Sequence, residues 1–312
     1  MANRYINPFT DFGFKKLFGE EVNKDLLVDF LNSLLPEKHR IKDLSYKKTD
    51  QLGESLVDRR AVFDIYCQSE AGDKFIVELQ KAKQNFFKDR SVFYSTFPIR
   101  EQADRGEWNF ELAAVYCIGI LDFVFEEDKE NPDYLHRVQL KDQRNAVFFD
   151  KLTFIYLEMP KFEKREDDLE TANDRWLYFI KNLSEFDHIP ERLRNRIFEK
   201  AFQQAEIAQF QPEQREAYEK SLKYYRDIKN VVDTSFGEGF EEGRMTGLEE
   251  GKQMGLEEGK QMGLEEGKQM GLEEGKYHEK LSIARNLLSL GFSMEQIAQA
   301  TGLSLQQVEN LH

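Results

Sequence analysis

The chain has 312 residues, of which 40% are hydrophobic and 33% charged, and its formal net charge is −14 at pH 7. This length allows one sizeable core with further elements appended to it, and the acidic balance argues against nucleic-acid binding through overall charge. No apolar run is long enough to span a membrane, and the first residues lack the apolar region of a signal peptide, so we expect a cytoplasmic protein.

The first predicted element is a helix over residues 10–35, where leucine and phenylalanine recur at helical spacing until Pro36 ends it. Residues 42–58 predict a strand or loop. Two strand-like runs follow, Ala61–Cys67 and Lys74–Lys81, joined by a polar linker that contains a glycine. This pattern predicts a β-hairpin.

Three polar residues interrupt the apolar pattern of this hairpin. Side chains alternate between the faces of a strand, so Glu78 and Gln80 share a face that Asp64 can reach from the first strand. Burial of a carboxylate is costly without a partner, and two converging carboxylates beside an amide suit a hard cation such as Mg²⁺. Such an ion supports phosphodiester hydrolysis. The alternative is that both acids lie on a solvated sheet face.

Several stretches of the chain resemble the bacterial Rpn family, the recombination-promoting nucleases also labelled transposases, within the PD-(D/E)XK nuclease superfamily. They span most of residues 1–235 and lie at Thr10–Gly19, Phe63–Ile65, Val77–Gln80, Arg90–Tyr94, Val115–Leu121 and Trp176–Phe179. The resemblance implies an α/β, restriction-endonuclease-like fold with a mixed sheet flanked by helices. It also implies a metal-dependent DNA endonuclease linked to recombination or mobile elements.

The same resemblance assigns roles to the hairpin residues. Asp64 and Glu78 would hold Mg²⁺, or another divalent cation such as Mn²⁺, and Gln80 would help to position the attacking water. Gln80 stands where the superfamily has a lysine, and an amide cannot supply positive charge. Lys81 points to the opposite face, whereas Lys83 or Lys88 could swing into the site. The alternative function is therefore a catalytically inactive member of the fold that binds DNA or another protein.

A basic stretch directly follows the second strand of the hairpin. Between positions 81 and 100 a single acid, Asp89, is outnumbered by Lys81, Lys83, Lys88, Arg90 and Arg100. We expect the first four of these to contact DNA phosphates, and the alternative is a solvated helix face. The residues from 84 to 104 predict a helix interrupted near Pro98.

The remaining strands of the predicted core are more apolar. Residues 113–121 predict a central strand covered on both faces, and residues 148–159 predict one or two more strands. The cysteines Cys67 and Cys117 read as reduced core residues, because their spacing does not suit a metal. We assign residues 1–160 to the nuclease core.

Beyond residue 160 the pattern becomes helical. The segments 174–183, 191–208 and 212–232 carry helical spacing, and the aromatic side chains of Trp176, Tyr178 and Phe179 are expected to pack them onto the core. We therefore assign residues 161–235 to an all-helical extension.

Residues 236–277 contain a repeat of eight residues, Gly-Leu-Glu-Glu-Gly-Lys-Gln-Met. Its leucines drift by about 80° per copy around a helix, so no straight apolar stripe forms. Two glycines per copy each cost about 1 kcal/mol relative to alanine. An isolated helix would therefore be marginal, and we expect a polar spacer that is helical when a partner supports it.

The last segment, residues 278–312, predicts a small helix-turn-helix module. One helix ends at Gly291, and Ser293 and Ser304 each begin a capping box of a further short helix. The module would read DNA or serve as a protein–protein or structural cap, and the lack of Lys and Arg after Ser304 favours the cap. We also expect homo-oligomers to form through this C-terminal helical region.

Overall fold

The computed structural model describes residues 3–51, 61–103 and 109–311. The chain forms two compact units, Met1–Thr234 and Ser235–His312. Among the described residues, no helix combines the length and the apolar character needed to cross a membrane.

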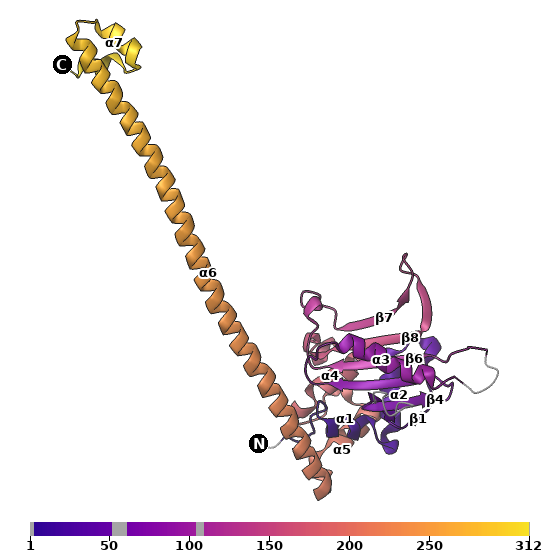
Figure 1. The fold of residues 1–312 in the computed structure, drawn as a ribbon. Coiled ribbons are helices and arrows are strands. Elements are labelled where there is room, and N and C mark those ends of the chain that lie inside the picture. The colour runs from indigo at the N-terminus through magenta and orange to yellow at the C-terminus, as the bar shows by residue number, and fades with distance from the viewer. Residues whose placement is uncertain (1–2, 52–60, 104–108, 312) are drawn as a thin grey trace. The chain divides into compact units, whose positions relative to one another are not determined.

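A six-stranded mixed sheet forms the centre of the first unit (Figure 1). The described strands are β1 (Leu44–Tyr46), β2 (Asp50–Gln51), β3 (Ala61–Val62), β4 (Ile65–Ser69), β5 (Lys74–Gln80), β6 (Val115–Leu121), β7 (Leu135–Lys141) and β8 (Val147–Glu158). The order in the sheet is β1-β4-β5-β6-β8-β7, with β5, β6 and β8 parallel and the outer pairs antiparallel, while β2 and β3 pair with each other. The predicted hairpin is confirmed as the antiparallel pair β4 and β5.

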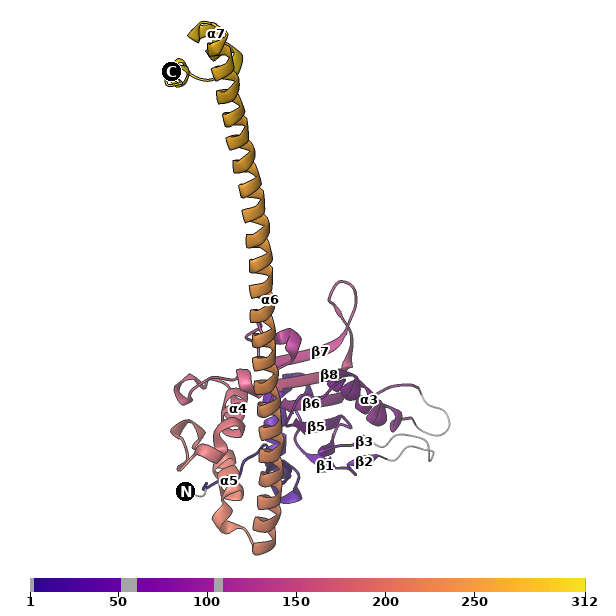
Figure 2. The same ribbon diagram turned by 60° about the vertical axis from the view of Figure 1, so that its left-hand side comes forward.

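Helices cover both faces of this sheet (Figure 2). The α-helices of the first unit are α1 (Asp11–Phe18), α2 (Lys24–Leu34), α3 (Phe87–Arg100), α4 (Ala172–Asn182), α5 (Arg196–Ala205) and the beginning of α6 (Pro212–Ser289). Helix α3 lies on one face, where it packs through Phe87. The larger core lies on the other face, with α1, α2, α4 and α5. The predicted restriction-endonuclease-like α/β class is therefore confirmed.

Short 3-10 helices connect many of these elements. They lie at Glu21–Asn23, Glu37–His39, Glu126–Asp128, Met159–Lys161, Glu166–Asp168, Leu183–Glu185, Glu191–Leu193 and Ile207–Gln209.

The N-terminal region contains two helices where one was predicted. Helix α1 ends because the backbone N–H of Gly19 bonds to the carbonyl of Lys15 and the chain then becomes extended at Glu20. The buried side chain of Asn23 donates to the carbonyl of Lys16 at 2.8 Å, which satisfies another acceptor at the end of the helix. Apolar residues keep helical spacing across this turn, so the sequence pattern does not show that the helix is divided in two.

Two further expectations need correction. Pro98 lies inside α3 without interrupting it, because it falls in the last turn of the helix. Strand β7 was not predicted, since an edge strand with partly exposed faces alternates only weakly. The central strand β6 is buried at every position, as expected, and both cysteines are free and buried.

The helices after residue 160 pack on the core as predicted. Trp176 and Phe179 are fully buried there, and Tyr178 is partly buried. Asp174, near the start of α4, is also buried and accepts hydrogen bonds from the ammonium of Lys164 at 2.9 Å and the backbone N–H of Thr171 at 2.9 Å. Burial alone would raise the pKa of Asp174, but these bonds outweigh it and lower the pKa to about 2.

This low pKa predicts how acid affects the fold. Because the folded pKa lies below the usual value near 3.9, Asp174 stabilises the fold above about pH 4, and the contribution of about 2 kcal/mol is lost as the pH falls toward 2. Urea unfolding of Asp174→Asn should therefore show this loss at pH 7 and a shrinking difference from wild type below pH 4. Asp167→Asn, at an exposed position, is the control. A difference that stayed constant with pH would contradict the assignment.

The octapeptide repeat is helical throughout, as part of α6. Its leucine and methionine side chains are exposed, and ten glycines recur at every fourth position from Gly239 to Gly275. The helical state fits the expectation of a spacer that is helical when supported. Once a helix is nucleated, each added residue gains a backbone hydrogen bond, so a long helix tolerates residues that a short one does not.

The second unit ends in a small helical cluster. Helices α7 (Met294–Thr301) and α8 (Leu305–Glu309) begin with the predicted capping boxes. Gly302 between them has φ +65°, a left-handed conformation that glycine adopts without strain. The cluster is held by four buried apolar side chains, Ala284, Ile297, Leu303 and Val308.

Candidate functional site

Asp64, Glu78 and Gln80 lie together where β4 begins and β5 ends. The backbone N–H of Leu79 donates to Oδ2 of Asp64 at 2.7 Å, and the N–H of Asp64 donates to Oε1 of Glu78 at 3.3 Å. Gln80 donates from Nε2 to Oε2 of Glu78 at 3.2 Å. The three residues singled out by the sequence therefore form one hydrogen-bonded group.

The sheet register explains this convergence. Ile65 lies opposite Val77, so Asp64 precedes the paired part of β4 and meets Glu78 on the neighbouring strand. The predicted first strand is broken at Phe63 and Asp64, which frees the backbone and side chain of Asp64 to bond across to β5. Both carboxylates are fixed by backbone groups before any ligand arrives.

The electrostatics of this pair suit a cation. Burial raises the pKa of Asp64, and burial together with the neighbouring charge of Asp64 raises the pKa of Glu78 to about 8. Within the described chain, no lysine or arginine nitrogen is within ion-pair distance of either carboxylate. Two half-buried carboxylates and an amide are a suitable donor set for a hard divalent ion.

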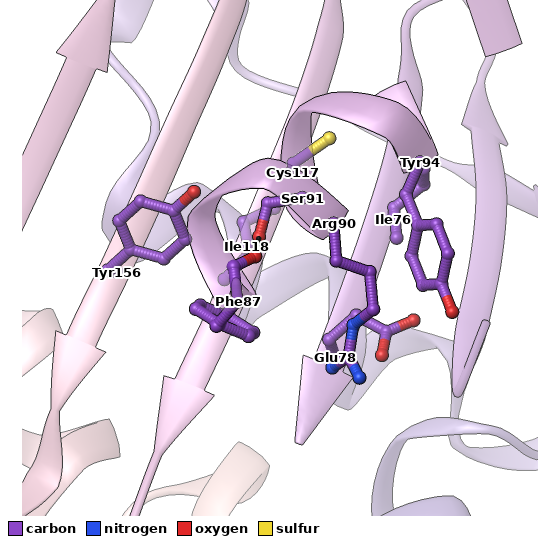
Figure 3. A pocket seen from close by; sticks show the side chains of 10 residues that line it. Ile76, Glu78, Phe87, Arg90, Ser91, Tyr94, Cys117, Ile118 and Tyr156 are labelled. Atoms are coloured by element: carbon purple, nitrogen blue, oxygen red, sulfur yellow. Dashed lines mark hydrogen bonds between the residues drawn. The ribbon is translucent and has the colours of Figure 1, made fainter. Parts of the chain in front are cut away.

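A pocket of about 20 Å³ adjoins Glu78 on the α3 side of the sheet (Figure 3). Its wall includes Arg90 and Tyr94 of α3, and β6 passes beneath it at Gly119. A side chain at Gly119 would come within 3.0 Å of the ring of Tyr156, so glycine keeps the pocket open.

An open cleft of about 530 Å³ adjoins Asp64. It is lined from α1 by Asp11 and Lys15, which form an ion pair of 3.0 Å, and from α6 by Ser221. Sequence reasoning gave Asp11 and Lys15 no role. The available signal was that Asp11 is a polar residue inside the first stretch that resembles the family.

The four basic residues expected to contact DNA have different surroundings. Lys83 pairs with Glu126 at 3.0 Å, and Lys88 pairs with Glu127. The ammonium of Lys81 lies 5.4 Å from the ring centre of Tyr224. Of these four residues, Arg90 is the one that lines the pocket beside Glu78.

A second acidic group lies elsewhere on the sheet. Asp128, His136 and Glu158 place ligand atoms within 4.8 Å of one another. The ammonium of Lys161 is already 2.5 Å from Oε2 of Glu158 and donates to the carbonyl of Asp128 at 2.6 Å. This lysine supplies positive charge to the buried Glu158.

Comparison with known protein families agrees with the geometry. The family model described as PD-(D/E)XK nuclease family transposase matches residues 8–235. The model of the Rpn/YhgA-like nuclease family C-terminal HTH domain matches residues 278–312, and that of the N-terminal part of the essential protein Yae1 matches residues 246–281. Searches of curated proteins and of solved structures gave no match. The chain therefore belongs to the PD-(D/E)XK nuclease family transposases and ends in the HTH domain of the Rpn/YhgA-like nucleases.

Proposed function

We propose that the protein is a divalent-cation-dependent DNA endonuclease that acts in DNA recombination or in mobile elements. The observation that carries the proposal is the fixed convergence of Asp64, Glu78 and Gln80 between two hollows of the surface. Mg²⁺ or Mn²⁺, when bound, supplies Lewis-acid activation of water and neutralises charge on the phosphate.

The chain's own residues would prepare the reaction. Asp64 and Glu78 would hold the cation, and Gln80 would orient the water whose oxygen forms a bond to phosphorus as one ester P–O bond breaks. The DNA backbone would lie over both carboxylates, between the cleft that Lys15 lines and the pocket beside Glu78. Lys81, Lys83 and Lys88 would act at most as outer phosphate contacts, since the last two are paired with glutamates.

A plasmid assay tests the function. Purified full-length protein is incubated with supercoiled plasmid in Mg²⁺, in Mn²⁺ or in EDTA. We expect nicked or linear DNA with metal and intact DNA in EDTA. Intact plasmid in every sample, with DNA retained in a gel-shift assay, would instead favour the inactive binding protein. The uncharged Gln80 is the observation in favour of that second candidate.

Substitution of Gln80 measures its contribution. Gln80→Ala should lower the rate of cleavage by about tenfold or more, because an orienting neighbour of a metal ligand is removed. Gln80→Lys should retain or raise the rate, since it restores the usual charge of the superfamily. The rates are compared in single-turnover plasmid assays. An unchanged rate in Gln80→Ala would show that the amide has no part in the reaction.

The HTH domain should serve DNA affinity or assembly rather than cutting. Deletion of residues 277–312 removes the four-residue apolar cluster that holds α7 and α8, so we expect weaker DNA binding or a smaller oligomer and an unchanged rate at saturating DNA. The control is deletion of one repeat copy, Gly255–Met262, which should change neither property. Size-exclusion chromatography with light scattering measures the size of the oligomer, and a DNA titration measures the affinity for DNA. Loss of all cleavage in the truncated protein at saturating DNA would contradict this division.

A further inference from the structure

The proposed nuclease site lacks the positively charged side chain that the superfamily has at the position of Gln80. Gln80 stands where the superfamily places a lysine, and Gln80 is buried and bonded to Glu78. Hydrolysis builds negative charge on the phosphate, and a preorganised cation normally stabilises that charge. Lys83 and Lys88, which follow in sequence, are exposed and held in ion pairs with Glu126 and Glu127. A cation for this role therefore has to come from elsewhere.

Arg90 is positioned for it from helix α3. Figure 3 shows its guanidinium at the same end of the pocket as the carboxylate of Glu78. The guanidinium carbon lies 5.6 Å from the ring centres of both Phe87 and Tyr94, and Arg90 also donates to the side chain of Gln84. These three contacts hold the side chain in place without neutralising its charge.

The charge of Arg90 is uncompensated in the described structure. Glu78 is near enough to feel the positive charge of Arg90, but no carboxylate oxygen of the described residues is within ion-pair distance of its guanidinium. A guanidinium presents several donors in one plane and binds phosphate in a forked geometry. Arg90 lies beside Glu78, a proposed ligand of the cation. A phosphate held by that cation would need a second positive partner at this position.

Lys81 is the other candidate, and its surroundings fit the role less well. It follows Gln80, the last residue of β5, and its charge acts on Asp64. Its ammonium lies over the ring of Tyr224 in α6. Lys81 therefore belongs to the side of Asp64 where the open cleft lies, and Arg90 belongs to the side of Glu78.

We infer that Arg90 supplies, from α3, the positive charge toward the scissile phosphate that the superfamily takes from a lysine at the position of Gln80. The inference rests on the proposed nuclease function and adds to it a residue that stabilises the negative charge built on the phosphate during hydrolysis. If it holds, a lysine introduced at position 80 should make Arg90 dispensable.

The test is a rescue experiment in the full-length protein. Single-turnover cleavage of supercoiled plasmid in Mg²⁺ is measured for wild type, Arg90→Gln, Gln80→Lys and the double variant. We expect the cleavage rate of Arg90→Gln to fall by about a hundredfold or more, the usual loss when an enzyme is deprived of one preorganised donor. The double variant should cleave at least about ten times faster than Arg90→Gln. The control is Arg100→Gln. Arg100 lies in the same helix and stacks on the ring of Phe97, and its loss should leave the cleavage rate at the wild-type value.

Two further measurements separate charge from folding. Circular dichroism melting of each variant reports the fold, and Arg90→Lys keeps the charge and the aliphatic stem, so its rate should lie between those of wild type and Arg90→Gln. DNA affinity in EDTA should differ by less than about threefold between Arg90→Gln and Arg100→Gln, since each loses one exposed or half-exposed charge.

The outcomes are distinct. A wild type that cuts no DNA with metal would remove the proposed function itself. A wild type that cuts, together with an Arg90→Gln variant as fast as wild type, would remove only the role of Arg90. A slow Arg90→Gln variant that Gln80→Lys does not rescue would make Arg90 a packing residue of α3 and overturn the inference.

Discussion

Asp64→Asn and Glu78→Gln are expected to abolish metal-dependent cleavage while leaving the protein as stable as wild type or more stable. Each carboxylate is half-buried beside the other, and burial together with repulsion from Asp64 raises the pKa of Glu78. Neutralising either one relieves that repulsion, so the free energy of unfolding should not fall. The rate of cleavage should fall by at least about two orders of magnitude, because an incomplete set of charges can no longer hold the cation.

The amides are better probes than alanine at these positions. Asp64→Asn keeps an oxygen that can accept from the N–H of Leu79, and Glu78→Gln keeps one that can accept from the backbone N–H of residue 64. Plasmid cleavage in Mg²⁺ and urea unfolding at neutral pH measure the two effects on the same samples. Asp64→Ala, which also removes the acceptor for Leu79, should lose both activity and stability. A fully active Asp64→Asn or Glu78→Gln variant would refute the assignment of these residues.

The sequence was most informative where one pattern dominated. Alternation in the hairpin and the continuous apolar run of β6 predicted the centre of the sheet. The polar residues within the hairpin pointed to Asp64, Glu78 and Gln80 as candidate site residues. Burying a carboxylate among apolar side chains costs free energy, so such a residue is rare and stands out from the apolar pattern of the sequence. The register of the short hairpin then brings these polar residues close together.

Other parts could not be predicted because they depend on contacts distant in sequence. Asp11 reaches the site region because α1 lines the same cleft as Asp64, which no local pattern of α1 reveals. Arg90 looked like one of several basic residues on a surface helix. Its difference from Lys83 and Lys88 arises from the rings of Phe87 and Tyr94 and from the glutamates that hold the two lysines.

The helix of the repeat depends on support from outside the repeat. An isolated repeat helix would be marginal, whereas α6 continues from a segment that is anchored on the core. Tyr218 accepts a hydrogen bond from the backbone of Asn7 at 2.9 Å, and Tyr225 donates to Asp122 at 2.7 Å. These contacts fix the first turns of α6 within the first unit, so the unfavourable nucleation step is already made.

Trp176→Ala is expected to destabilise the first unit by about 3–5 kcal/mol, the usual cost of removing a large buried aromatic side chain. Trp176 is fully buried in α4, its ring centre is 4.7 Å from that of Phe198 and 5.6 Å from that of Phe18, and its indole N–H donates to Asp29 at 2.7 Å. The substitution would leave a cavity and an unpaired carboxylate between the extension and the N-terminal helices. Urea unfolding followed by circular dichroism measures the loss.

This substitution also tests whether the helical extension is part of the nuclease fold. Because Trp176 contacts both α1 through Phe18 and α5 through Phe198, the sheet and the extension should unfold in one transition, with a shifted midpoint in the variant. Trp176→Phe keeps a ring in the cavity and should lose less. Cleavage by Trp176→Ala should be near normal at low temperature, where the protein remains folded, and should fall on warming in parallel with the dichroism signal. A loss below about 0.5 kcal/mol, the range of surface substitutions, would mean that the extension is not joined to the core through this residue.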